Sequence, residues 1–161
     1  MNSIRVILSG GLGNQLFQYA TGRALAERTG AELVLDTVTG FKDDKVYNRS
    51  YELDVFPGPK ACRKADTPSK RAWLWLRIRH RKRIPLLAKI LNVTDEVLHG
   101  ADLNNLPSVK GETLLIGFWQ EESYFLSVRD QLRKELCMEE VQSREAHEVA
   151  VHVRRVQYTR G

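Results

Sequence analysis

The sequence predicts an α/β fold, a Rossmann-like parallel sheet with flanking helices. The prediction depends first on a strand–turn–helix–strand pattern at the start of the chain. A short apolar run over residues 4–8 leads into glycines, a helical pattern covers 15–29, and a second apolar run covers 32–36. A helical connection of about this length joins parallel strands by a right-handed crossover. A β-branched and aromatic run over 113–120 and alternating valines over 149–153 predict further strands.

The helices are predicted from apolar spacing and from their end signals. The first is expected to begin at about Gln15, with Asn14 as its cap, and to end at Gly30. Apolar residues at helical spacing predict another helix over 122–137. The Pro-Gly-Pro sequence at 57–59 predicts a chain break between them.

Length and composition limit the functional classes. A chain of 161 residues, 42% hydrophobic and 28% charged, is typical of one globular domain rather than a disordered chain. It has no apolar run of the ~18 residues that a membrane-spanning helix needs. Cys62 and Cys137 lie far apart and fit no metal-ligand spacing, so we expect reduced thiols, a cytoplasmic protein and no metal.

The net charge of +5 is concentrated in one segment. Residues 60–83 contain ten Lys or Arg against the single acid Asp66, together with Trp73 and Trp75. One interpretation is a solvated basic segment with its tryptophans in the core. The other is peripheral contact with an anionic membrane surface, since interfacial helices combine Trp with basic residues. No nucleic-acid motif accompanies the charge, and we expect no nucleic-acid partner.

The glycine turn after the first strand is the first candidate site. Gly10, Gly11 and Gly13 allow positive φ and close approach of a ligand, and the helix that follows favours an anion at its N-terminus. The dinucleotide motif G-x-G-x-x-G would need glycine where Leu16 stands. Asp36 ends the second strand, where a ribose-binding acid would lie, so a dinucleotide fold remains an alternative. A tight turn without a ligand is another.

The second candidate site is His152-Val153-Arg154-Arg155, at the end of the last predicted strand. Guanidinium groups bind phosphate oxygens in a bidentate fork, so Arg154 and Arg155 are candidates for holding a diphosphate leaving group. The alternative is a solvated edge strand with surface arginines.

Together these segments resemble a known family. Residues 10–20, GGLGNQLFQYA, resemble the opening motif of the α-1,2-fucosyltransferases of glycosyltransferase family 11. Three further segments follow in the family's order: Tyr51-Glu52-Leu53 with Phe56, then Gly117-Phe118-Trp119-Gln120 before Tyr124-Phe125, then 152–155.

The resemblance implies metal-independent transfer of fucose from GDP-fucose to the 2-hydroxyl of a galactoside acceptor, with inversion, in cell-surface glycan synthesis. No cofactor is implied beyond the GDP-fucose donor. Arg154 and Arg155 would contact the donor diphosphate, and His152 matches the motif histidine. The cleft glycine loop would comprise Gly10, Gly11, Gly13, Asn14 and Gln15. The resemblance assigns no catalytic base, and Gln157 stands where the family motif has an acid.

The implied architecture is a two-domain GT-B glycosyltransferase whose α/β domains face each other. Residues 1–140 would form the N-terminal domain on the acceptor side, and 141–161 the linker and first strand of a truncated donor-binding domain. Family members are roughly twice as long, so we expect an N-terminal half that is inactive alone, at the inner face of a bacterial membrane. The rival hypotheses are a non-catalytic nucleotide- or glycan-binding α/β module and a dinucleotide-binding oxidoreductase domain.

Overall fold

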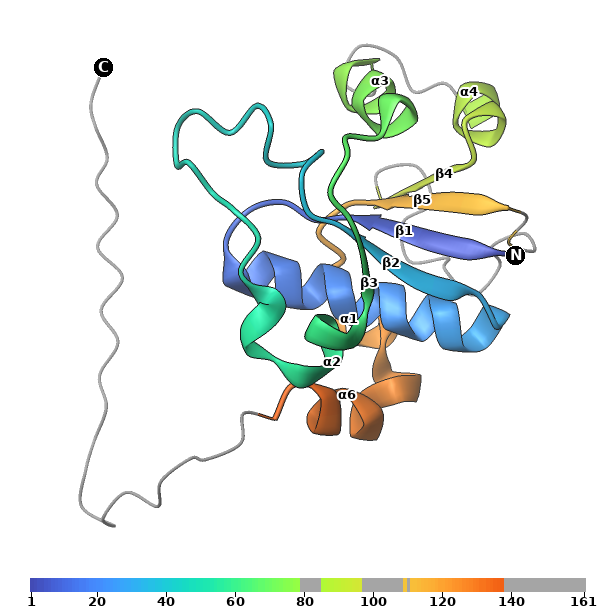
Figure 1. Ribbon diagram of the computed structural model, residues 1–161. Coiled ribbons are helices and arrows are strands. Elements are labelled where there is room, and N and C mark those ends of the chain that lie inside the picture. Colours follow the sequence, from blue (N-terminus) through green and yellow to red (C-terminus); the bar gives the residue numbers. More distant parts are fainter. Residues whose placement is uncertain (79–84, 97–108, 110, 138–161) are drawn as a thin grey trace.

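The computed structural model describes residues 1–78, 85–96, 109 and 111–137. Within them lies a parallel sheet with helices on both faces, which confirms the predicted α/β, Rossmann-like fold (Figure 1). The strands are β1 (Ser3–Ile7), β2 (Glu32–Asp36), β3 (Arg63–Ala65), β4 (Val93–Asp95) and β5 (Glu112–Ile116). The α-helices are α1 (Leu12–Thr29), α2 (Pro57–Ala61), α3 (Lys70–Ile78), α4 (Pro85–Ile90) and α6 (Arg129–Glu135). The 3₁₀ turns are η1 (Leu53–Val55), η3 (Glu122–Tyr124) and η4 (Leu126–Val128).

The strand order in the sheet is β3-β2-β1-β5-β4, and every neighbouring pair is parallel. β1 lies at the centre, where Val6 pairs with Leu35 of β2 on one side and with Leu115 of β5 on the other. A strand covered on both faces has an almost continuous apolar sequence, as the first run of this chain does. The sheet therefore brings the carboxyl ends of β1, β2 and β5 to one edge.

Two separate apolar clusters form the core, one on each face of the sheet. On one face α1, η4 and α6 pack against β1 and β2, with Tyr19 and Trp119 among the buried side chains. On the other face α3 and α4 pack against β4 and β5, with Trp75 at the centre. Figure 1 shows this division, with α1, α2 and α6 on the side of the sheet opposite α3 and α4.

Two predictions about helices were wrong. The helix predicted over 122–137 is two 3₁₀ turns followed by α6, because Phe125 (φ −132°, ψ 11°) and Val128 (φ −115°, ψ 18°) leave the helical region. Two residues of the apolar pattern that predicted this helix, Val128 and Leu132, are nevertheless buried. The Pro-Gly-Pro sequence does not only break the chain, since Pro57 begins α2, where a proline lacks no hydrogen bond.

The predicted strand over 113–120 was also too long. β5 ends at Ile116, because Gly117 (φ 147°) and Trp119 (φ 55°) turn the chain out of the sheet. β3 lies inside the basic segment, which had not been predicted to contain a strand. The strand predicted over 149–153 and the domain assigned to 141–161 lie outside the described residues, and the boundary at 140 stays a prediction.

Candidate functional site

The glycine turn lies at the carboxyl end of β1, where open α/β sheets bind their ligands. Gly10 has a φ of 75°, and Gly11 is the residue that caps α1, with extended backbone angles. The helix thus begins at Leu12, three residues earlier than predicted, and no side chain bonds to its first amides. The prediction that Asn14 caps the helix was wrong, because Asn14 lies within its first turn.

The buried side chain of Gln15 joins this turn to the second family-like segment. Its Nε2 donates to the carbonyl oxygens of Gly10 and Ser50, each at 2.9 Å. Its Oε1 accepts a hydrogen bond from the backbone amide of Glu52 at 2.9 Å. Gln15 has no exposed surface, so it stabilises the turn from the protein interior and does not itself contact a ligand.

Gln18, one turn further along α1, makes the corresponding connection to the third segment. Its Oε1 accepts from the amide of Ser9 at 3.0 Å, and its Nε2 donates to Ser9 Oγ at 3.1 Å. The same Nε2 donates to the carbonyl oxygen of Gly117 at 3.0 Å. The two glutamines therefore bring three of the four family-like segments together at one edge of the sheet.

The surface of this edge carries polar side chains together with the exposed apolar residues Leu12 and Phe118. Gln120 Nε2 donates to Asn14 Oδ1 at 2.8 Å, so the first and third segments also meet at the surface. A Cβ added to Gly13 would meet no atom within 4 Å, whereas one added to Gly11 would lie 2.9 Å from Nη1 of Arg49. The turn thus offers the first amides of α1 beneath an exposed arginine, an arrangement suited to an anionic ligand. The open space at Gly13 belongs instead to a groove lined by apolar residues that include Leu16, Phe17 and Phe125.

Arg49 is a candidate that the sequence did not identify. It stands in a polar loop without a motif, and its guanidinium carbon lies 5.3 Å from the centre of the Tyr47 ring. Only the fold brings this loop over Gly11, through the hydrogen bonds of Gln15. No local pattern in the sequence could have shown that.

The loop after β5 is fixed by a carboxylate and by a tryptophan in an uncommon conformation. Glu96 accepts hydrogen bonds from the amides of Phe118 (2.7 Å) and Trp119 (2.9 Å). Trp119 has a positive φ, which is rare for a bulky side chain, yet it is buried and packs edge-on against Tyr124 with centroids 5.3 Å apart. The surrounding bonds hold this backbone conformation in place.

Asp36 does not provide a ribose-binding carboxylate. It is fully buried, and its Oδ2 accepts from Nε of Arg5 at 2.9 Å and from Oγ1 of Thr39 at 2.7 Å. Its Oδ1 accepts from the amides of Val38 (3.1 Å) and Thr39 (2.7 Å). Both oxygens are thus occupied inside the protein, which argues against the dinucleotide-binding alternative.

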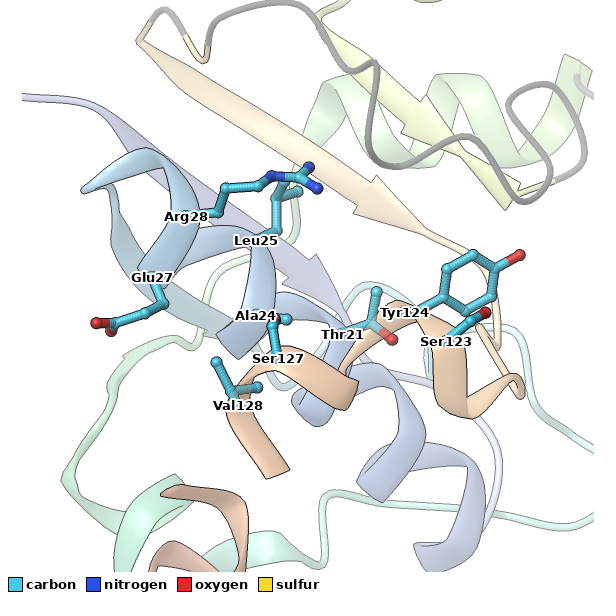
Figure 2. A pocket seen from close by; sticks show the side chains of 9 residues that line it. All are labelled: Thr21, Ala24, Leu25, Glu27, Arg28, Ser123, Tyr124, Ser127 and Val128. Carbon is cyan, nitrogen blue, oxygen red and sulfur yellow. The ribbon is translucent and has the colours of Figure 1, made fainter. Parts of the chain in front are cut away.

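A cavity of about 380 Å³ lies beside α1, away from the glycine turn. Figure 2 shows it between α1 and the turns η3 and η4, with the hydroxyls of Thr21, Ser123 and Tyr124 among its polar groups. Burial and the nearby carboxylates of Glu121 and Glu96 raise the pKa of the Tyr124 hydroxyl. None of the glycine-turn residues lines this cavity.

The remaining predicted site residues, His152, Arg154 and Arg155, lie outside the described residues, and their roles stay predictions. Within 1–78, 85–96, 109 and 111–137 no three His, Cys, Asp or Glu side chains are grouped to hold a metal ion. In the same residues no helix has the length and hydropathy to cross a bilayer.

The fold and this edge describe an α/β protein with a glycine turn that is a candidate for ligand binding. Among curated proteins, the chain is similar to an alpha-1,2-colitosyltransferase of Escherichia coli, at 29% identity over 98% of the chain. The alignment covers 56% of that relative, so the chain spans little more than half its length. No family model matches, and no solved structure matches. This similarity to a sugar transferase supports glycosyltransferase as the general class of the chain.

Proposed function

We propose that the chain contributes the glycine-turn side of a galactoside α-1,2-fucosyltransferase site that uses GDP-fucose without a metal. The observation that carries the proposal is the joining of three family-like segments by Gln15 and Gln18 at the edge where β1 and β5 end. Similarity to a sugar transferase over nearly the whole chain supports the same class.

The reaction we propose is a direct displacement. The 2-hydroxyl oxygen of the galactoside forms a bond to C1 of fucose, while the bond from C1 to the diphosphate oxygen breaks and its electron pair leaves with GDP. The acceptor proton passes to a base, which we do not assign. Inversion follows from attack opposite the leaving group, and cations beside the diphosphate stabilise its developing charge. Arg154 and Arg155 are the proposed cations, with His152 in the same motif.

The glycine turn belongs to the domain that the resemblance assigns to the acceptor side, and we propose that it also reaches across the cleft to the diphosphate of the donor. Amides at the start of α1 and the guanidinium of Arg49 would attract the same diphosphate. Asn14 and Gln120 present a carboxamide pair beside it, suited to sugar hydroxyls.

The relative's name favours a second donor sugar, colitose, which is fucose without its 3-hydroxyl. A site that hydrogen-bonds this hydroxyl discriminates strongly against the sugar lacking it, because its polar groups would be left unpaired. Comparing the dissociation constants of GDP-fucose and GDP-colitose distinguishes the two specificities. The third possibility, a binding module without catalysis, predicts nucleotide-sugar binding but no transfer by any assembly containing the chain.

Calorimetric titration of the 161-residue chain tests the donor site. We expect GDP-fucose and GDP to bind and NAD not to bind. Gly11→Ala should weaken GDP-fucose binding by about tenfold, since the new methyl group would lie 2.9 Å from Nη1 of Arg49 and would displace this guanidinium from the turn. Arg49→Gln should weaken it by about tenfold, the loss of one charge-assisted contact.

Lys134→Ala is the matched control, because this exposed residue belongs to α6 and not to the turn. It should bind GDP-fucose like the unchanged chain. Binding of NAD in preference to GDP-fucose, or full GDP-fucose affinity in both Gly11→Ala and Arg49→Gln, would contradict the proposal. Radiolabelled fucose transfer to a galactoside in EDTA then tests whether the chain turns over alone and without metal.

A further inference from the structure

Helices α3 and α4 form one layer on the sheet face opposite α1, and their outer sides carry exposed apolar residues. Leu74 of α3 is 43% exposed, and Leu86 and Ile90 of α4 are 68% and 69% exposed. Their inner sides pack on the sheet, through the buried residues Ala72, Trp75 and Ala88. Figure 1 shows the two helices side by side on this face.

Basic side chains alternate with these apolar ones. Lys70, Leu74 and Arg77 have the i, i+4, i+7 spacing of one helix face, and Lys89 stands between Leu86 and Ile90 on α4. All three basic residues are exposed. We call Lys70, Leu74, Arg77, Leu86, Lys89 and Ile90 the α3–α4 surface.

Trp73 lies beside two basic side chains, Arg77 of the α3–α4 surface and Lys42 of an earlier loop. The guanidinium of Arg77 lies 4.6 Å from the ring centroid of Trp73, and the ammonium of Lys42 lies 5.9 Å from it. Trp75, by contrast, is buried and donates to the carboxylate of Asp95. The interpretation that the tryptophans of the basic segment lie in the core is thus confirmed for Trp75, whereas Trp73 is only half-buried.

The charge of this part of the chain is of one sign. The sequence from Lys70 to Ile90 contains no Asp or Glu and includes RHRKRI over 79–84, which joins the two helices. Arg71 is paired with Glu112 and does not add to the surface. The acids in the loops before α3 are Asp43, Asp44, Glu52 and Asp66.

We propose that the α3–α4 surface binds the surface of an anionic phospholipid bilayer. The exposed leucines and isoleucine would enter the headgroup region, and the flanking basic residues would attract acidic lipids. A nucleic acid would use the charge but leave the apolar side chains exposed, and a second copy of this face would meet like charge. The inference is independent of the proposed transferase activity.

Co-sedimentation of the 161-residue chain with vesicles tests this surface. Vesicles of phosphatidylcholine with 30% phosphatidylglycerol should bind the chain, and vesicles of pure phosphatidylcholine should bind it at least tenfold more weakly. The triple variant Lys70→Gln, Arg77→Gln, Lys89→Gln should lose about fivefold per removed charge, and 0.5 M NaCl should have a similar effect. Leu86→Ser with Ile90→Ser should lose about tenfold or more.

The matched control is Leu126→Ser with Arg133→Gln, which removes an exposed apolar and an exposed basic residue on the opposite face of the sheet. It should bind vesicles like the unchanged chain, and circular dichroism should show that all variants remain folded. Equal binding to both vesicle types, no binding to either, or equal loss in the control would overturn the proposal. Light scattering that shows a dimer abolished by the Leu86 and Ile90 changes, or tight binding of a DNA oligomer without vesicle binding, would overturn it too.

Discussion

Gln18 donates a hydrogen bond from Nε2 to the carbonyl oxygen of Gly117 at 3.0 Å, across 99 positions of sequence. The donor belongs to α1 and the acceptor to the loop after β5, so one buried carboxamide ties the two loops at the edge of the sheet. The same side chain also accepts the amide of Ser9, the residue before the glycine turn. The shape of the candidate site therefore depends on a residue that no ligand can reach.

Gln18→Leu should lower the free energy of unfolding by about 2 to 3 kcal/mol, because the partly buried amide of Ser9 and carbonyl oxygen of Gly117 lose their partner. Urea denaturation followed by tryptophan fluorescence measures this. Gln120→Ala, at an exposed position of the same site, should change it by no more than about 0.5 kcal/mol. Equal losses in the two variants would mean that the bonds of Gln18 contribute no more than a surface contact.

Asp36→Ala should be more destabilising, by about 3 to 5 kcal/mol. The change leaves the largely buried Arg5 with Glu112 at 3.8 Å as its remaining carboxylate, and it removes the acceptor for two amides and a hydroxyl. Glu32→Gln removes the partly exposed pair with Arg63 and should cost less than about 1 kcal/mol. Thermal and urea unfolding of both variants check the difference. A loss below 1 kcal/mol in Asp36→Ala would contradict the role of Asp36 as an internal anchor.

The first β-α-β unit could be predicted because its signals are local. An apolar run, glycines and an apolar helical spacing lie within 36 residues, and each element needs only its neighbours to be recognised. The end of β5 could not be predicted in this way. Trp119 favours a strand by composition, but Glu96, 23 positions away, holds its amide and stabilises a positive φ.

The candidate site also has one part that local sequence signals predict and another part that depends on contacts between distant residues. Its glycine turn could be predicted from the sequence, because glycines between a strand and a helix are typical of a tight turn where a ligand can approach the backbone. The roles of Gln15, Gln18 and Arg49 do not, since their partners lie at positions 50, 52 and 117 and at Gly11. A polar residue on the inner side of a helix is one signal that could have indicated such bonds, because buried amides need partners.

Alkaline pH should destabilise the fold through Tyr19. Burial, followed by its hydrogen bond to Glu135, raises the pKa of this hydroxyl far above its ordinary value of 10.0. Below pH 10 both the folded and the unfolded chain keep the proton of the Tyr19 hydroxyl, so the stabilisation from this group is fully present. Above it the unfolded chain loses the proton first, so stability should fall by up to about 1.4 kcal/mol per pH unit.

Urea denaturation between pH 8 and pH 11 measures that slope. Tyr19→Phe should be less stable at pH 8 by about 1 kcal/mol, since it lacks the bond to Glu135, but its stability should fall less steeply above pH 10. Identical slopes for the variant and the unchanged chain would show that another group causes the alkaline loss.

Two glycines of α1 should respond in opposite ways to the same added methyl group. A Cβ at Gly22 would lie 2.4 Å from Cγ2 of Val6 and 3.1 Å from Cδ1 of Leu33, both in the packed layer between helix and sheet. Gly22→Ala should therefore lower the free energy of unfolding by about 1 to 3 kcal/mol, although alanine is the better helix former. At Gly13 a Cβ meets nothing within 4 Å, so Gly13→Ala should leave stability unchanged or raise it by up to about 1 kcal/mol. Parallel urea titrations of the two variants check the signs, and equal losses of stability would show that the packing against Val6 and Leu33 does not decide the outcome.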